Sequence, residues 1–590
     1  MWKPMIPTLV DEPPLKKNWI FETKYDGFRC GLSWTSEDIK LISRNQKDLT
    51  ENFPEVVEWC KSQQHKIEDL LPLFIDGEIV ILRTEFQAIF DLVQQRGRIK
   101  TKKKINQAKQ NRPATFMAFD LIHYQNHDIS NQSLRDRRKK LEQISQHLQT
   151  ENFAFRRPFN LVQQFNQYDE IHGVIKLHQA EGIVAKKTSS PYSNGKRTND
   201  WVKIKNYRMV QGAITNWNAN NDYFEVAYFN EDQFNTLGKV KNGFKEKDKK
   251  TLITFIQEHG EQTSSSLWSV HPSACIDIKC LDAKDGELRE PFFHQFRFDL
   301  EPDDVTKDLV REGLAQLPKE IELSKPDKEL FPHTTKRDYV LYLREVAPIL
   351  LPRLQDKRLT MIRYPDGIDE HSFYQKHLPD YAPDYIQTVP GDEDEEDILC
   401  QDLKSLLWFG NHAALEFHVP FQTIHSSYPD EMVFDLDPPS LNEFSLAIVA
   451  AQLIKEMCEH KGFKTFAKTS GKTGLQVHIP LEPESMTFDE TREFMEAVAN
   501  VLVTKYPNDY TIERLKKNRG NRLYVDYIQH APGKTIVAPY SPRATRHASV
   551  ATPLYWDEVT EQLDPTNFTI HSVPERIKRI GCPFLQMPNS

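Results

Sequence analysis

The chain has 590 residues, of which 76 are basic and 85 acidic, giving a formal net charge of −9 at pH 7. This length is too great for one hydrophobic core and indicates about three or four domains. The acidic balance gives no global sign of nucleic-acid binding, and no uncharged run approaches the roughly 18 residues of a membrane span. The seven cysteines stand singly, so neither a zinc knuckle nor a disulfide scaffold is indicated, and we expect a cytosolic protein with no membrane partner.

In chain order, residues 19–204 alternate short apolar runs with polar helical stretches, which predicts an α+β domain. Residues 212–298 read as short strands separated by turns, as in a small barrel. The acidic, proline-containing stretch that follows predicts a linker over 301–320. A second α/β unit then begins with helical spacing over 340–350.

Two charge runs interrupt the otherwise even distribution of charge. Between Arg96 and Arg112 lie six further basic residues and no acid, whereas residues 392–397 are all acidic. A solvated loop is the ordinary explanation of such runs, and for the basic run a binding patch is an equal alternative.

Lys24 stands in the stretch FETKYDGFRC, where a strand is expected to end. Its aromatic neighbours Phe21, Tyr25 and Phe28 suggest partial burial, and an unpaired buried ammonium is costly. Lys24 therefore either has an anionic partner or takes part in chemistry. The KxDG pattern alone is too short to decide between these.

An ordered series of short motifs follows this lysine: SRN at 43–45, DGE at 76–78, FD at 119–120, EGIVAKK at 181–187 and WVKIK at 201–205. In order and spacing, the series resembles the nucleotidyltransferase superfamily of ATP-dependent DNA ligases, RNA ligases and capping enzymes. The resemblance implies an adenylation domain over 1–205, in which Lys24 carries AMP as a phosphoramidate and passes it to the 5′-phosphate of a nick.

The residue types suit this role. An amine that attacks an α-phosphate must lose its proton, and Lys203 and Lys205, on one strand face, are expected to lower the pKa of Lys24 and hold phosphate oxygens. Glu181 offers an oxygen ligand for Mg²⁺. The resemblance implies that Phe119 stacks the adenine, although in isolation this aromatic would be assigned to the core. It also implies ribose, base or phosphate contacts from Glu22, Arg29, Arg44 and Glu78.

The barrel-like segment, over 206–300, resembles the oligonucleotide-binding (OB) fold that DNA ligases and capping enzymes append. Arg289 and Arg297, in LREPFFHQFRFD, are candidates for the last family motif, with Arg297 as a nucleotide contact. Either could equally be a surface arginine.

A second constellation lies in MVFDLDPP, where Asp435 and Asp437 project from the same face of an apolar strand. Two such carboxylates repel each other unless cations neutralise them, and a two-metal centre needs this pair and a further acid. Asp526, in LYVDYI, is the third candidate. A structural or surface role is the commoner explanation of DxD alone.

The stretch KTSGKTGLQVHIPL, over 468–481, supplies backbone amides and a cation for a triphosphate without the spacing of a Walker A loop. With RYPDGID, FYQKH, LEFH and VAPYSPRA it resembles the primase-polymerase domain of bacterial DNA ligase D, of the archaeo-eukaryotic primase superfamily. The resemblance implies a polymerase domain over 321–590, metal ions on the three aspartates, and nucleotide contacts from His418, Ser470, Lys472 and Arg543.

It also implies that Lys328 and Lys336 grip a 5′-phosphate. A core histidine at 418 and a solvated helix start at the two lysines are the alternatives.

Together these patterns indicate an α+β multidomain DNA end-joining enzyme that fills in and seals breaks, in bacterial non-homologous end joining. The resemblance implies ATP and either Mg²⁺ or Mn²⁺ as cofactors, and a preference for ribonucleotides over deoxynucleotides. It implies DNA ends, nicks and gaps as substrates, and the end-binding protein Ku as partner. The expected location is the nucleoid. No His- and Asp-rich segment is left for the phosphoesterase domain of many family members. RNA ligation or capping, and non-catalytic bridging of DNA ends, are the alternatives. The primase-like half opposes the former, and the intact catalytic positions oppose the latter.

Overall fold

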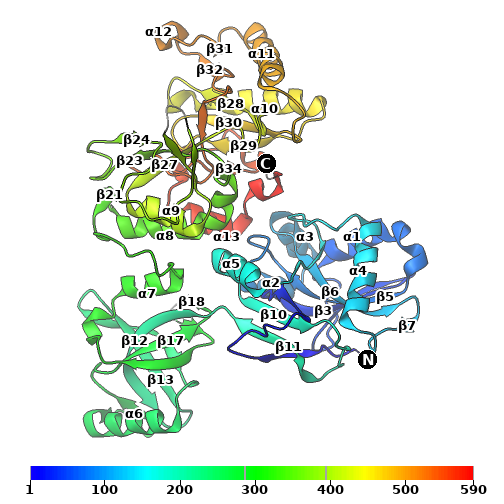
Figure 1. Cartoon of the computed structure of the whole chain (residues 1–590), viewed down its shortest axis with the longest axis vertical. Helices are drawn as coiled ribbons and strands as arrows, with labels where there is room; N and C mark the ends of the chain where they lie inside the picture. The colour runs from blue at the N-terminus through cyan, green and yellow to red at the C-terminus, as the bar shows by residue number, and fades with distance from the viewer. Residues whose placement is uncertain (1, 285–286, 392–394, 589–590) are drawn as a thin grey trace. The chain divides into compact units, whose positions relative to one another are not determined.

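The computed structural model describes residues 2–284, 287–391 and 395–588. The chain divides into two compact units, Met1–Leu317 and Pro318–Ser590. Both units combine helices with strands, which confirms the predicted α+β multidomain class (Figure 1).

The first part of unit 1 is built on two β-sheets. One sheet has the order β1 (Ile6–Leu9), β11 (Arg197–Lys205), β10 (Gly182–Lys187), β2 (Trp19–Thr23) and β9 (Gln164–Phe165). The other has the order β4 (Ile39–Ser43), β3 (Phe28–Trp34), β5 (Leu73–Val80), β6 (Thr115–Tyr124) and β7 (His127–Asp128), with β8 (Phe159–Leu161) beside β6. Ile20 and Trp201 of the first sheet share a buried cluster with Val80 and Met117 of the second, so the sheets pack face to face.

Helices cover the outer faces of these sheets. They are α1 (Pro54–Gln63), α2 (Phe90–Arg98), α3 (Lys102–Asn111), α4 (Leu134–Leu148) and α5 (Tyr168–His178). Val56 of α1 and Leu141 of α4 pack on the second sheet, and Ile171 of α5 packs on the first. Lys24 follows directly on β2, so its position is set by the sheet that carries Glu181 at the start of β10.

The second part of unit 1 is a five-stranded barrel. Its strands are β12 (Arg208–Asn218), β13 (Tyr223–Asn230), β14 (Gln233–Val240), β17 (Cys275–Cys280) and β20 (Phe292–Arg297), with α6 (Glu246–His259) between β14 and β17. β12 pairs with β13 and β17, and β17 pairs with β20. A parallel bridge from Asn242 to Phe292 closes the ring between the end of β14 and β20. This order, with a helix between the third and fourth strands, is that of the OB fold, which the family resemblance implied for this barrel-like segment. Short strands β15 (Glu261–Gln262), β16 (Leu267–Ser269), β18 (Asp282–Lys284) and β19 (Glu287–Arg289) decorate it.

The stretch expected to be a linker, 301–320, is folded over most of its length. It contains a 3₁₀ turn at Pro302–Asp304 and helix α7 (Lys307–Ala315), whose first turn is capped by Thr306. Val310 joins the core of the barrel, and a Cβ at Gly313 would lie 2.3 Å from the carbonyl oxygen of Met209. This helix was not predicted because its sequence is mostly polar and only a narrow apolar stripe of it is buried.

Unit 2 is also built on two sheets. One has the order β24 (Phe373–Gln375), β23 (Thr360–Arg363), β27 (Ala414–Pro420) and β33 (Thr535–Val537). The other has the order β31 (Tyr510–Thr511), β32 (Leu523–Asp526), β28 (Glu431–Asp437), β30 (Leu475–Pro480), β29 (Phe466–Thr469) and β34 (Pro553–Leu554). Val433 of β28 packs against Ile536 of β33, so these two sheets also meet face to face.

The remaining elements of unit 2 surround these sheets. The helices are α8 (Lys336–Leu350), α9 (Leu403–Asn411), α10 (Phe444–His460), α11 (Phe488–Lys505), α12 (Lys516–Arg519) and α13 (Val573–Ile580). Short strand pairs are formed by β21 (Glu329–Phe331) with β22 (Thr334–Thr335) and by β25 (Thr388–Pro390) with β26 (Glu396–Ile398). Residues 392–394 of the acidic run lie outside the described residues. All seven cysteines are free and buried. None of the helices in the described ranges has the length and apolar character of a membrane span.

The fold predicts one pH dependence. His530 is fully buried beside Thr491, and burial lowers its pKa to about 4. The unfolded chain therefore binds a proton here more readily, so stability is complete above about pH 6.5 and falls by about 2 kcal/mol on acidification to about pH 5. In calorimetry of the whole chain, His530→Phe should weaken this acid-induced fall in melting temperature. His425→Phe, at an exposed site, should not, and equal falls in both variants would contradict the assignment.

Candidate active sites

Lys24 lies in the turn between β2 and β3, where its backbone amide donates to the carbonyl oxygen of Gly182 (2.9 Å). Its ammonium nitrogen is 2.5 Å from Oε1 of Glu181, and the two side chains are 22% and 7% exposed. Burial alone would lower the pKa of Lys24, but the charge and hydrogen bond of Glu181 outweigh it and hold the pKa above its ordinary value. Lys24 thus has the anionic partner that its burial requires.

The neighbouring lysines do not have the effect expected of them. Lys203 and Lys205 lie on one face of β11, opposite Val184 and Gly182 of β10. Burial, followed by the charges of Lys24 and Lys205, lowers the pKa of Lys203 instead. The expectation that the pKa of Lys24 is lowered overall is wrong for this structure, because the attraction of Glu181, which contacts the ammonium directly, outweighs the repulsion from the neighbouring lysine. This ion pair must open before the amine can act as a nucleophile.

The second carboxylate oxygen of Glu181, Oε2, is buried and has no hydrogen-bond partner among the described residues. Mg²⁺ binds through one or two carboxylates together with phosphate oxygens. An unpartnered carboxylate oxygen beside the candidate nucleophile therefore fits the predicted metal ligand.

Gly27 and Asp26 complete the lysine turn. A Cβ at Gly27 would lie 2.2 Å from the carbonyl oxygen of Ile79, so this approach of the turn to β5 requires glycine. Asp26 forms a two-pronged ion pair with Arg289 of the barrel. Arg297, selected from the sequence as the nucleotide contact, binds Asp277 and Asp299 of the barrel instead. Of the two candidate arginines, Arg289 is the one that reaches the turn of Lys24.

A cavity opens beside Glu22, which is 2% exposed and pairs with Lys186 (2.6 Å). The cavity has a volume of about 550 Å³, within the range of small-molecule sites, and its lining includes Tyr25, Met117, Arg138 and Gln164. The Gln164 amide donates to Glu22 (3.3 Å), and Arg138 lies 3.5 Å from the same carboxylate.

Phe119, predicted to stack adenine, lies on β6 and is 8% exposed. The ammonium of Lys186 and the guanidinium carbon of Arg29 each lie 4.3 Å from its ring centroid. These cation–π contacts occupy the ring, so stacking of a base on it requires a side chain to move.

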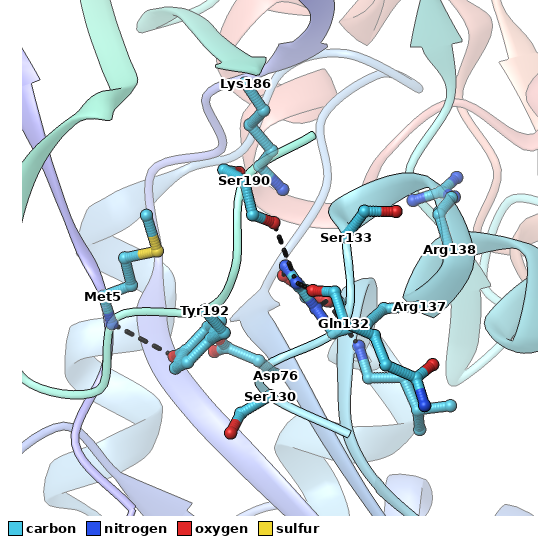
Figure 2. Close-up of polar contacts among 12 residues, drawn as sticks. Met5, Asp76, Ser130, Gln132, Ser133, Arg137, Arg138, Lys186, Ser190 and Tyr192 are labelled. Carbon is cyan, nitrogen blue, oxygen red and sulfur yellow. Dashed lines mark hydrogen bonds and ion pairs between the residues drawn. The ribbon is translucent and has the colours of Figure 1, made fainter. Parts of the chain in front are cut away.

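A polar network fixes Arg29 beneath this ring. Arg29 donates twice to Asp76 (both 2.7 Å), and Asp76 also accepts from the hydroxyl of Tyr192 (2.7 Å). Figure 2 shows that hydroxyl lying between Asp76 and the backbone amide of Met5, which donates to it. In the same view Arg137 donates to the carbonyl oxygens of Ser190 and Gln132.

The remaining two candidates of unit 1 border Arg29. Glu78 lies opposite Arg29 on the neighbouring strand, and burial raises the pKa of Glu78 to about 8 despite the charges of Arg29 and Lys24. Arg44 follows β4, is exposed, and donates its backbone amide to the carbonyl oxygen of Arg29 (3.0 Å).

In unit 2, the three candidate aspartates meet on neighbouring strands. Asp435 and Asp437 share one face of β28, and Asp526 of β32 lies directly opposite Asp435. Burial, with the charges of Asp437 and Asp526, raises the pKa of Asp435. Within the described ranges, no three or more His, Cys, Asp or Glu side chains are arranged to hold a metal ion as they stand. The three half-buried carboxylates nevertheless carry like charges that a divalent cation would neutralise. Such a cation would take its other ligands from substrate phosphates.

Two residues that sequence reasoning did not select support Asp435. Gln476 of β30 donates to Asp435 (3.1 Å) and accepts from the ammonium of Lys468 (2.5 Å). Lys468 is fully buried, and burial lowers its pKa to about 7.

Glu416 gathers three of the predicted nucleotide contacts. This fully buried carboxylate of β27 lies 2.9 Å from Nε of Arg543, 3.1 Å from Nε2 of His418 and 3.5 Å from Nζ of Lys472. Burial would raise the pKa of Glu416, but its hydrogen bond to His418 and the charges of Arg543 and Lys472 lower it to about 2. His418 is therefore hydrogen-bonded to a buried carboxylate, an arrangement that fits both a nucleotide contact and the alternative of a satisfied core histidine.

The loop that carries Ser470 is tied to this cluster. The hydroxyl oxygen of Ser470 accepts from the amides of Lys472 (3.3 Å) and Gly474 (2.9 Å), while its carbonyl accepts from Arg543 (2.9 Å). Gly471 has φ of +74°, a conformation that favours glycine.

The two candidate phosphate-gripping lysines differ. Lys328 pairs with Asp366 (2.5 Å), a carboxylate that is 72% exposed. Lys336 is 6% exposed, donates to the carbonyl oxygen of Ser324 (2.5 Å), and has a pKa lowered by burial. A freely solvated helix start, the alternative from sequence, does not describe Lys336.

Comparison with known families agrees with this division. Residues 6–205 match the ATP dependent DNA ligase domain, and residues 335–584 match the LigD primase-polymerase domain. The bifunctional non-homologous end joining protein LigD of Bacillus subtilis is 39% identical over 587 residues, covering 98% of this chain and 96% of that protein.

The chain belongs to the LigD family. The multifunctional LigD of Pseudomonas aeruginosa is 24% identical, with 98% of this chain covered and 71% of that protein. Among solved structures, the polymerase domain of Mycobacterium tuberculosis ligase D in complex with DNA is 29% identical, with a TM-score of 0.43, covering 46% of this chain and 99% of that one. This LigD-family chain is thus an end-joining enzyme with an ATP-dependent DNA ligase domain and a primase-polymerase domain.

Two residues that contact candidate site residues were not selected from the sequence, Lys186 in unit 1 and Glu416 in unit 2. Glu416 stands two positions before His418 on one strand, so period-two spacing could have found it. Lys186 meets Glu22 from a neighbouring strand, and no local spacing indicates that contact.

Glu416 provides a test of the nucleotide cluster. Glu416→Ala removes the anion that positions Arg543, Lys472 and His418, so we expect the KM for incoming nucleotide in primer extension to rise about tenfold, equivalent to about 1.4 kcal/mol. Glu482→Ala, at an exposed glutamate of the same unit, should leave the KM unchanged. A KM for Glu416→Ala equal to that of the parent would remove Glu416 from the site.

Proposed function

We propose that Lys24 is the adenylylated nucleophile of the ligase domain. Its amine attacks the α-phosphorus of ATP, an N–P bond forms as the bond to pyrophosphate breaks, and the amine proton leaves. A 5′-phosphate oxygen of nicked DNA then displaces the lysine, and the adjacent 3′-hydroxyl displaces AMP to seal the strand. The observation that carries this proposal is the half-buried Lys24 paired with Glu181, whose second carboxylate oxygen has no partner among the described residues.

The neighbouring side chains have distinct roles in this proposal. Glu181, bound to Mg²⁺ or Mn²⁺ through its unpartnered oxygen, would release Lys24, and the bound cation would supply positive charge for the phosphates. Lys203 and Lys205 would hold phosphate oxygens, as would Arg297 after a change in its present partners. Glu22, Phe119, Arg29, Arg44 and Glu78 would hold the base and ribose of ATP.

We propose further that Asp435, Asp437 and Asp526 form the polymerase centre. These carboxylates would hold divalent cations, which would supply positive charge for the phosphates while the primer 3′-hydroxyl bonds to the α-phosphorus of the incoming nucleotide and pyrophosphate leaves. His418, Ser470, Lys472 and Arg543 would hold the triphosphate, and Lys328 and Lys336 the 5′-phosphate at a break. The family resemblance supports ribonucleotides as the preferred substrates.

The domain assignment follows: adenylation over 1–205, OB fold over 206–300 and polymerase over 321–590. Two catalysts in one chain raise their effective concentration at one break, so filling and sealing can follow without release. We place this work on DNA ends, nicks and gaps, beside Ku, at the nucleoid in the cytoplasm.

Two variants separate the centres. Lys24→Ala should abolish labelling of the chain by α-labelled ATP, because it removes the amine that forms the N–P bond in this proposal, while primer extension persists. Asp435→Ala should abolish primer extension while labelling persists. Label that survives Lys24→Ala would refute the nucleophile, and joint loss of both reactions in either variant would refute two independent centres.

A gapped duplex tests the coupling. On a 5′-phosphorylated duplex lacking one nucleotide, the parent chain with ATP, ribonucleotides and Mn²⁺ should yield a filled and sealed strand. Gel analysis with Lys24→Ala should show filling without sealing, and sealing without filling would contradict the order proposed.

A further inference from the structure

The basic run singled out in the sequence has no place in either centre described above. In the structure it spans the end of α2, the short connection and the whole of α3 (Figure 1). Five of its side chains are exposed, and we call them the α2–α3 strip: Arg98, Lys100, Lys102, Lys103 and Lys104.

Three acids near these two helices are already engaged. Glu55 binds Arg96, and Glu58 binds Lys109. Asp91, at the start of α2, pairs with Lys284. Within the described ranges no residue of the α2–α3 strip forms an ion pair, so its positive charge faces solvent uncompensated.

The start of α3 adds to this excess. Its first turn contains three lysines and no acid, and Thr101 makes no capping hydrogen bond through its side chain. Cations in a first turn are disfavoured by the helix dipole, whereas anions are favoured there. The lysine side chains and the helix N-terminus are therefore both positive. A polyanion bound here would neutralise both.

The strip is continuous with the site of Lys24. Phe28, directly after Gly27 of the lysine turn, packs against Phe90 at the start of α2, with ring centroids 6.3 Å apart. At the other end of α2, Gly97 lies so close to Phe28 that a Cβ there would be 2.5 Å from its ring. Arg98 is the next residue, so the strip begins immediately behind the nucleophile turn.

We propose that the α2–α3 strip is a docking surface for the sugar–phosphate backbone of the duplex that flanks the nick. The stretch from Arg98 to Lys104 spans roughly 10–15 Å of extended chain and helix. At about 3.4 Å of duplex axis per phosphate of one strand, this length matches about three or four phosphates. The inference rests on the proposed function of Lys24, because the nick must lie at that residue for the flanking duplex to reach the strip.

The test uses the full chain carrying Lys102→Ala, Lys103→Ala and Lys104→Ala. Affinity for a nicked duplex is measured by fluorescence anisotropy over a series of salt concentrations. Affinity falls with salt, and each phosphate contact contributes about −0.9 to the slope of log K against log salt concentration. Losing three contacts should therefore make the slope less steep by about 2 to 3. Labelling by α-labelled ATP, which needs no DNA, should equal that of the parent.

Two further variants sharpen the result. Lys16→Ala with Lys61→Ala and Lys139→Ala removes the same charge from scattered exposed positions and should retain the parent slope. Lys102→Arg with Lys103→Arg and Lys104→Arg should also retain it. An unchanged slope in the strip variant, or an equal loss in the scattered variant, overturns the inference. Failure of the parent chain to label overturns the function proposed for Lys24 instead.

Discussion

Charged groups placed between two packed sheets must be neutralised there, and this constraint shapes both centres. In unit 1 three such anions meet a cation before any nucleotide binds, in the pairs Glu181 with Lys24, Glu22 with Lys186, and Asp76 with Arg29. A nucleotide entering that site must therefore exchange partners, replacing protein carboxylates with its own phosphates. Binding and activation of the nucleophile are thereby coupled through the same ion pair.

Unit 2 solves the same problem in two ways. Around Glu416 one buried carboxylate contacts two cations, Arg543 and Lys472, and the imidazole of His418, so these side chains are held in place. At Asp435, Asp437 and Asp526 the carboxylates face one another, with Gln476 as a neutral hydrogen-bond donor and Lys468 behind it. The cluster around Glu416 already holds cations in place for a polyanion. The three aspartates, by contrast, lack the positive charge that a bound metal cation would supply.

Much of the architecture could be predicted from the sequence. The apolar runs LFIDGEIVIL, FMAFDLI and MVFDLD became β5, β6 and β28, because period-two burial and branched residues specify strands locally. The polar stretch at 134–148 became α4 for the equivalent helical reason. Pairings across long sequence separations, such as Asp26 with Arg289, could not be predicted from one sequence, since nothing local records the partner. The direction of the Lys24 pKa was missed for that reason: two nearby lysines were visible, and the contact of Glu181 was not.

Helix α7 alters where the chain can be divided. Because Val310 completes the barrel core and Gly313 touches the backbone of Met209, a ligase fragment ending near residue 300 would expose apolar surface and invite aggregation. A cut between Leu317 and Pro318 keeps that surface covered. Helix α7 is therefore part of the barrel domain. An exchange of polymerase domains between relatives should place the junction after this helix.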